Sequence, residues 1–372
     1  MAFGETVAQI HLGLLAKNLG QVQKRIGKKP IIAIVKANAY GHGAVEISKY
    51  LIKSSRQIAM LGVASLDEAI VLREAGIHKT PILLMTGFSV SRIKDVVAYQ
   101  LTPALFDLSA LSMLSRYAKK ARCKLSVHLK VDTGMGRLGI SPDEVPGFLQ
   151  KAIGAGIIVS GIFSHFADAD LSDLTYAREQ LSKLKKLRAG LKPAATQPYF
   201  HLANSAAILN FPAAHLDYVR QGLMLYGYSP LQQGKQSVGL SPILTLKSRV
   251  LSIKKVLAGT AISYGRTFIT TRETHVAVIG IGYADGYPRS LSNCGEMIAK
   301  GVRVPVIGRV CMDMTMVDVT NVPGLSVGDF VTVIGQEGKE AIWANELAKK
   351  ADTISYEILC GLKTNIPRVY VK

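Results

Sequence analysis

The chain has 372 residues, 48% of them hydrophobic and 19% charged, which excludes a disordered protein and fits two domains or a barrel with an added domain. Lys and Arg number 45 against 26 Asp and Glu, giving a net charge of +19. The basic residues are scattered over helix-forming segments without an aromatic-interleaved stripe, so we expect a solvated basic surface and no nucleic-acid partner.

Between about residues 30 and 225, short apolar runs alternate with amphipathic segments. Eight runs predict strands, at 31–35, 58–64, 81–85, 102–106, 124–131, 157–163, 199–202 and 218–223. Segments between them predict helices, for example at 67–75, 91–99, 109–121 and 171–191. This alternation favours parallel βαβ units, and eight of them favour a (β/α)8 barrel. A doubly wound open sheet is the alternative, because counting strands by eye can miss one or two.

After about residue 231 the pattern changes to strands without long helices between them. These strands are expected at 244–253, 275–282, 304–310, 315–319 and 330–334, followed by one helix at 342–351. Turn residues separate the strands, which favours an antiparallel, mostly β domain. We therefore expect a barrel over 11–235 and a mostly β domain over 236–372, which the N-terminal strand 1–10 joins.

The first barrel strand is followed by Lys36, in the segment Val-Lys-Ala-Asn-Ala-Tyr-Gly-His-Gly. In a barrel the active site lies at the C-terminal ends of the strands. Burial there would lower the lysine pKa from about 10.4 and make the amine a nucleophile toward an aldehyde. Position alone favours the other interpretation, a solvated surface lysine.

Polar residues also follow the later barrel strands. Arg137 lies in a glycine-rich loop suited to binding a carboxylate through its guanidinium fork. His165 is either a group that stacks on a flat ring or a buried, hydrogen-bonded imidazole. Ser205 and Gly222 follow the last two strands, where barrels commonly bind phosphate.

The second half of the chain presents Tyr264 between Ser263 and Gly265, then Tyr283, and then the segment 308–314. A tyrosine between small residues near a turn is either a presented phenol or an aromatic buried in a core or an interface.

The four cysteines are Cys123, Cys294, Cys311 and Cys360. They form no CxxC and no Cys/His cluster, so we expect no metal site and a reducing, cytoplasmic compartment. No apolar run approaches the roughly 20 residues that a membrane span needs, and the N-terminus does not resemble a signal peptide.

Taken together, these ordered segments resemble the alanine racemase family, which are fold-type III pyridoxal 5′-phosphate (PLP) enzymes. The resemblance covers essentially the whole chain. It rests on the Lys36 segment, 132–138, 203–205, 220–222, 263–265 and 308–314. It implies that the protein interconverts L- and D-alanine and supplies D-alanine for peptidoglycan, acting as a homodimer with shared active sites.

The resemblance also implies a role for each matching residue. Lys36 holds PLP and is the acid/base catalyst on one face of the substrate, and Tyr264 of the other subunit acts on the opposite face. His165 packs against the pyridine ring, and Arg220 hydrogen-bonds the ring nitrogen. The implied phosphate-binding and nearby cofactor-binding residues are Tyr40, Asn204, Ser205, Gly222 and Tyr356.

For the substrate carboxylate, the resemblance implies Arg137 and the backbone at Met312. The supporting residues are Lys130, Tyr283, Cys311 and Asp313, and Lys130 aligns with a lysine that is often carbamylated in relatives. Three alternatives remain: a racemase of broader substrate range, a PLP-dependent decarboxylase of the same architecture, and a non-catalytic PLP-binding protein. Arg220 and the segment around Tyr264 speak against the decarboxylase, and residues 240–372 speak against the binding protein.

Overall fold

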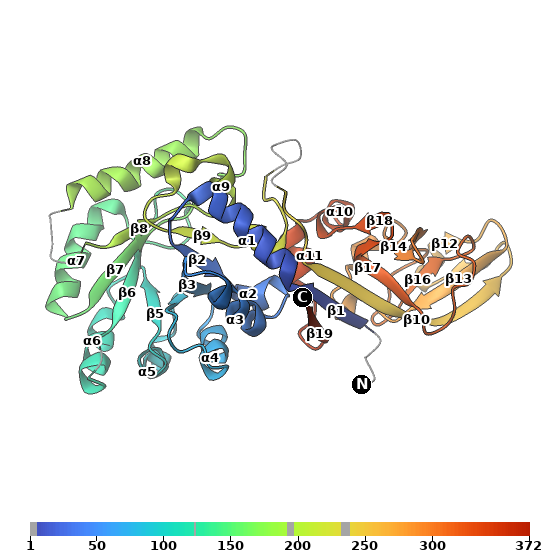
Figure 1. The fold of residues 1–372 in the computed structure, drawn as a ribbon, viewed down its shortest axis with the longest axis horizontal. Helices are drawn as coiled ribbons and strands as arrows, with labels where there is room; N and C mark the ends of the chain where they lie inside the picture. The colour runs from blue at the N-terminus through green and yellow to red at the C-terminus, as the bar shows by residue number, and fades with distance from the viewer. Residues whose placement is uncertain (1–5, 123, 192–196, 232–238) are drawn as a thin grey trace.

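The computed structural model of the chain describes residues 6–122, 124–191, 197–231 and 239–372. Two parts lie side by side: strands surrounded by helices at one end, and a β-rich part at the other (Figure 1). No helix of the described residues is long and apolar enough to cross a membrane. The cysteines at 294, 311 and 360 are free, and position 123 lies outside the described residues.

The first part is a nearly closed barrel of eight parallel strands. Their order is β8-β7-β6-β5-β4-β3-β2-β9, and a parallel bridge between His201 and Tyr218 links the two ends of the sheet. The barrel prediction is therefore confirmed, and the doubly wound alternative is wrong. The strands are β2 (Ile31–Ile34), β3 (Ile58–Val63), β4 (Ile82–Leu84), β5 (Thr102–Leu105), β6 (Ser126–Lys130), β7 (Ile158–Phe163), β8 (Tyr199–His201) and β9 (Val219–Gln221).

Helices cover the outside of the barrel (Figure 1). In α6 (Leu111–Lys120), the buried positions Leu111, Leu114, Ser115 and Ala118 recur at helical spacing. The helix expected at 171–191 begins only at Thr175, in α8 (Thr175–Gly190). The other helices of the barrel are α1 (Leu12–Ile26), α3 (Ala44–Ser54), α4 (Leu66–Glu74), α5 (Ile93–Ala98), α7 (Val145–Gly154) and α9 (Ser205–Asn210).

The second part is built on a nine-stranded sheet. The N-terminal strand β1 (Thr6–His11) lies between β10 (Leu244–Val256) and β19 (Arg368–Val371). The N-terminal strand, expected at 1–10, is observed in this sheet over residues 6–11, while residues 1–5 lie outside the described residues. The sheet is antiparallel except for the β1–β19 pair, which is parallel.

Two strand predictions in this part need correction. The strand expected at 275–282 ends early, as β13 (Thr274–Ile279), before Gly280 and Gly282, and the strand expected at 304–310 is β15 (Val302–Pro305). The expected helix is confirmed as α10 (Ala344–Lys350). The predicted boundary at 235/236 lies outside the described residues. The remaining elements are β11 (Ala261–Ile262), β12 (Phe268–Ile269), β14 (Glu296–Ala299), β16 (Thr315–Asp318), β17 (Phe330–Glu337), β18 (Glu340–Ile342) and α11 (Ser355–Cys360).

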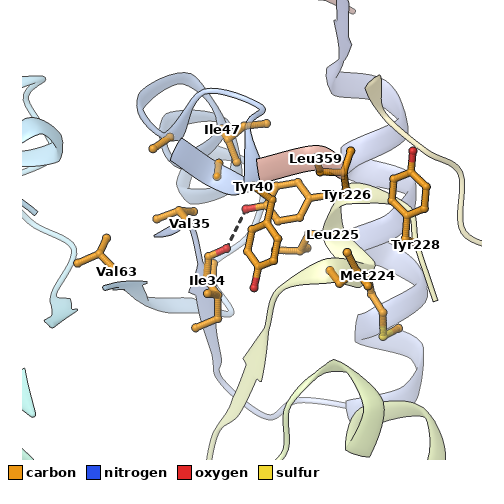
Figure 2. Close-up of a cluster of buried hydrophobic side chains, with 14 of the residues drawn as sticks. Ile34, Val35, Tyr40, Ile47, Val63, Met224, Leu225, Tyr226, Tyr228 and Leu359 are labelled. Carbon is orange, nitrogen blue, oxygen red and sulfur yellow. Dashed lines mark hydrogen bonds between the residues drawn. The ribbon is translucent and has the colours of Figure 1, made fainter. Parts of the chain in front are cut away.

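An aromatic cluster joins the two parts beneath the end of β2 (Figure 2). The Tyr226 hydroxyl donates to the Ile34 carbonyl at 2.8 Å, and its ring lies 4.8 Å from the ring of Tyr40. Leu359 of α11 packs into the same cluster. A Cβ on Gly41 would lie 2.2 Å from the Leu359 carbonyl oxygen, so this close approach requires glycine. The second part therefore packs directly on the segment that carries Lys36.

Candidate active site

A cavity of about 1430 Å³ opens at the C-terminal ends of the barrel strands. Many of the residues expected at the site line it together, although they come from distant parts of the sequence. These are Lys36, Tyr40, Arg137, His165, Asn204, Ser205, Arg220, Gly222 and Tyr356.

The segment after β2 is a left-handed turn, α2 (Lys36–Tyr40). The four residues from Ala37 to Tyr40 have φ values of 50°, 52°, 54° and 53°. L-residues pay roughly 1–2 kcal/mol each for this conformation. Because such strain persists only where the surroundings fix it, the turn marks a constrained position at the cavity.

Lys36 is the first residue of this turn and lines the cavity. Burial lowers the pKa of its amine, and the nearby positive charge of Arg137 lowers it further. Cys360 and Glu68 partly oppose this shift. The lowered pKa increases the neutral, nucleophilic fraction of the amine near neutral pH.

Arg220 points from β9 into the barrel and is 2% exposed. Its Nη2 donates to the carbonyls of Ser164 (2.7 Å) and Leu202 (3.0 Å) and lies 3.1 Å from His165 Nδ1. Burial lowers its pKa to about 9. The hydrogen bonds found among the described residues use only the two terminal nitrogens, so the Nε–H is left for a ligand in the cavity.

Two further histidines continue the Arg220 network, and sequence reasoning missed them. Arginine can only donate, so His201 Nδ1 accepts from Nη1 at 2.8 Å. His201 Nε2 then donates to His128 Nδ1 at 3.1 Å, and His128 Nε2 donates to the Tyr199 hydroxyl at 2.5 Å. Burial lowers the pKa of His128 to about 3. The signal was available, since His128 lies between Val127 and Leu129 in a predicted strand and His201 directly follows Phe200 in another.

The ends of β8 and β9 and the turn residue Tyr40 form a polar cradle. The Gly222 N–H donates to Ser205 Oγ at 3.2 Å, and a Cβ on Gly222 would lie 2.6 Å from the Tyr40 hydroxyl. Burial raises the pKa of Tyr356 to about 12, so this phenol stays a donor at neutral pH. The Asn204 side chain accepts the Ala207 N–H at 3.0 Å, so it caps α9.

The loop after β6 is organised by Asp132. Its carboxylate accepts the N–H groups of Gly134, Met135 and Gly136 at 2.8–2.9 Å. Burial opposes its ionisation, but these backbone donors hold its pKa below the usual range. Arg137 follows directly and lines the cavity.

Lys130, at the end of β6, is 6% exposed and lies behind the cavity rather than lining it. Its pKa is lowered to about 8, chiefly by burial and to a smaller extent by the positive charges of Arg137 and Arg220.

The remaining expected residues lie together elsewhere, on loops of the second part. The backbone N–H of Tyr283 donates to the Cys311 carbonyl at 3.0 Å, and that of Ala284 to the Met312 carbonyl at 2.9 Å. Tyr264 and Met312 are 70% and 54% exposed. We call this set of residues the loop cluster: Tyr264, Tyr283, Cys311, Met312 and Asp313. None of them lines the cavity within this chain.

In the described part of the chain, no group of three or more His, Cys, Asp or Glu side chains could hold a metal ion. The structure thus joins a mostly β domain to a barrel with a lysine at its mouth, an arginine in its interior and a polar cradle. This arrangement is the one expected from the resemblance to fold-type III PLP enzymes.

Comparison with known proteins identifies the family of the chain. Residues 10–230 match the family model "Alanine racemase, N-terminal domain", and residues 243–370 match "Alanine racemase, C-terminal domain". The chain belongs to the alanine racemase family.

Individual relatives match this chain over nearly their full length. The alanine racemase of Halothermothrix orenii is 42% identical over 368 residues, which are 98% of this chain and 96% of the relative. The alanine racemase structure from D-cycloserine-producing Streptomyces lavendulae has a TM-score of 0.92 at 32% identity, covering 99% of this chain and 97% of that one. A Bartonella henselae alanine racemase, described with covalently bound pyridoxal phosphate, has a TM-score of 0.87 at 28% identity, covering 99% of this chain and 100% of that one.

Proposed function

We propose that the protein is an alanine racemase that interconverts L- and D-alanine, with PLP bound through Lys36. The observation that carries the proposal is the convergence of Lys36, Arg137, Arg220 and the cradle around Gly222 on one cavity. This chemistry agrees with the family to which the whole chain belongs.

The residues around the cavity fit the cofactor. A phosphate would be held by the Gly222 backbone, Ser205 Oγ and the phenols of Tyr40 and Tyr356, which all line the cavity. The lack of a side chain at Gly222 leaves the Tyr40 hydroxyl open to such a ligand. The pyridine nitrogen would meet the free Nε–H of Arg220, and neutral His165 would pack beside the ring. When bound, PLP supplies an electron sink that delocalises the negative charge left on the α-carbon.

Lys36 provides the base on one face of the substrate. An α-proton is only weakly acidic, and racemisation removes it from one face and returns it on the other, so one acid/base group per face is the minimal design. The lowered pKa of Lys36 suits it to exchange a proton near neutral pH.

We assign the opposite face to Tyr264 of a second copy of the chain. Within one chain, Tyr264 does not line the cavity and its side chain is largely exposed. A homodimer that brings the loop cluster of each copy over the cavity of the other would complete both sites. In this arrangement the Met312 backbone joins Arg137 at the substrate carboxylate, and Tyr283, Cys311 and Asp313 support the loop.

Lys130 is the candidate for carbamylation. The reaction joins a neutral amine to carbon dioxide and releases one proton, and the buried amine has a lowered pKa of about 8. The resulting carboxylate would orient Arg137, which already acts on the Lys130 pKa as a nearby charge.

The biological role that follows is D-alanine supply for peptidoglycan in the cytoplasm. The test is to incubate the PLP-loaded protein with L-alanine, L-serine and L-lysine and to follow circular dichroism. We expect loss of the L-alanine signal without release of carbon dioxide. Equal rates on all three amino acids would indicate the broader-specificity racemase, and carbon dioxide release would indicate the decarboxylase.

A further inference from the structure

We propose that Glu68 is a positioning residue for Lys36, because its carboxylate ties the backbone directly after the lysine to the end of the neighbouring barrel strand. The inference rests on the proposed function, in which the position of the Lys36 amine governs proton transfer.

The carboxylate of Glu68 spans two strand ends. Its Oε1 accepts the N–H of Ala37, which follows β2, at 2.6 Å. Its Oε2 accepts the N–H groups of Ala64 and Ser65, which follow β3, at 2.7 and 3.1 Å. One side chain therefore sets the spacing between the Lys36 segment and the adjacent strand.

The left-handed turn needs such an external partner. The first N–H groups of any helical turn lack a carbonyl partner within it, and Ala37 lies in this position. A carboxylate is a stronger acceptor than a neutral oxygen, and it satisfies the N–H where the strained residues begin. Strain of this kind is held by its surroundings rather than by the turn itself.

Glu68 is itself held in place. It is the third residue of α4, and Ser65 Oγ accepts its backbone N–H at 3.2 Å, which completes a capping box. The Ala64 carbonyl in turn accepts the Thr86 hydroxyl at 2.5 Å, from the loop after β4. The hydrogen bonds thus run across three neighbouring strand ends. The sequence signal was the Ser65-Leu-Asp-Glu68 pattern, which marks a helix start and gives no hint of its contact with Ala37.

The charge of Glu68 gives a second measurable effect. Arg137 and Arg220 lower the pKa of Lys36, whereas Glu68 and Cys360 raise it. Removing the carboxylate charge should lower the pKa of the lysine nitrogen, an effect that loss of a helix cap alone would not cause.

The chain offers a matched control in Glu144. This glutamate forms the same kind of capping box, and its Oε2 accepts the Ser141 N–H at 2.7 Å. Its carboxylate bonds no residue of the turn that carries Lys36, so Glu144→Gln loses a capping carboxylate without touching that turn.

The experiment compares Glu68→Gln, Glu68→Ala and Glu144→Gln as PLP-loaded full-length proteins. The side chain of glutamine has a single acceptor oxygen, so it cannot accept N–H groups from both strand ends as the two oxygens of Glu68 do. The side chain of alanine accepts none. We expect both Glu68 variants to lower kcat about 10–100-fold with little change in KM, since small misplacements of catalytic groups cost this much. We also expect the visible absorbance of the cofactor held on Lys36 to titrate at a lower pH than in the wild type, with Glu144→Gln unchanged in both measurements.

Two results would overturn the inference: Glu68 variants that match Glu144→Gln in kcat and in the titration midpoint, or a loss of activity that follows a lowered melting temperature with an unchanged midpoint. A wild-type protein that racemises no amino acid would instead overturn the proposed function, and the absorbance titration would still report on Glu68.

Discussion

The barrel mouth and the loop cluster differ in how much of the site a single chain completes. At the mouth, Arg220 is 2% exposed and its terminal nitrogens are hydrogen-bonded. In the loop cluster, Tyr264 and Met312 are largely exposed, although backbone hydrogen bonds fix the loops. We therefore infer that a single chain binds the cofactor, whereas completion of the substrate site depends on assembly.

Lys36→Ala should have the largest effect, because in the proposed function it removes both the cofactor link and one acid/base group. We expect a loss of about 10⁴-fold or more in racemisation, measured by coupled D-alanine detection. Added PLP with a small external amine should restore exchange of the α-proton with solvent deuterium for one enantiomer more than for the other, because only the face served by Lys36 lacks its acid/base group. Equal exchange from both enantiomers would argue that Lys36 is only a tether.

Tyr264→Phe should lower the rate by about 10²–10⁴-fold, since it removes one acid/base group. The comparison between the two regions is tested by co-expressing this variant with Lys36→Ala. If sites are shared between subunits, half of the dimers are mixed and each carries one native site, so about a quarter of wild-type activity returns. No recovery in a mixture that forms mixed dimers would place both residues in the same chain.

Arg220→Glu tests the interior of the barrel. An arginine cannot give its proton to the ring nitrogen of bound PLP, whereas a carboxylic acid could, which would strengthen the electron sink and favour transamination. We expect about a 10²-fold loss of racemisation together with more keto-acid product, measured by mass spectrometry, and Arg220→Lys as the cationic control. An unchanged keto-acid yield would refute this role.

His128→Gln should have the smallest effect, on stability. His128 has a pKa of about 3 in the folded protein against 6.5 in the unfolded chain. Between pH 6.5 and 5, the unfolded chain takes up this proton and the folded protein does not. The free energy of unfolding therefore decreases by about 2 kcal/mol as the pH is lowered from 6.5 to 5. Denaturant titrations should show that His128→Gln loses this part of the slope. The exposed His78→Gln should keep it, and equal slopes in both variants would contradict the assignment.

The sequence predicted the barrel well because its apolar runs are long, repeated and bounded by polar residues. It predicted the second sheet less well, since short strands such as β14 and β18 carry charged residues and depend on their neighbours for pairing. The residues around Lys36 could be placed at one mouth by topology. The left-handed turn and the contact from Glu68 to Ala37 could not, because no local propensity favours four consecutive left-handed residues.

The pairing of β1 with both β10 and β19 sets an order of events during protein synthesis. The barrel strands leave the ribosome while β1 still lacks both neighbours, because β10 and β19 follow them in the chain. Domains generally fold as units from the N-terminal side, so the barrel can form early while β1 remains unpaired. Tyr356, which lines the cavity and which we propose as a phosphate ligand, also follows the barrel in the chain. A nascent chain should therefore gain firm cofactor binding only after the segment that carries Tyr356 has emerged.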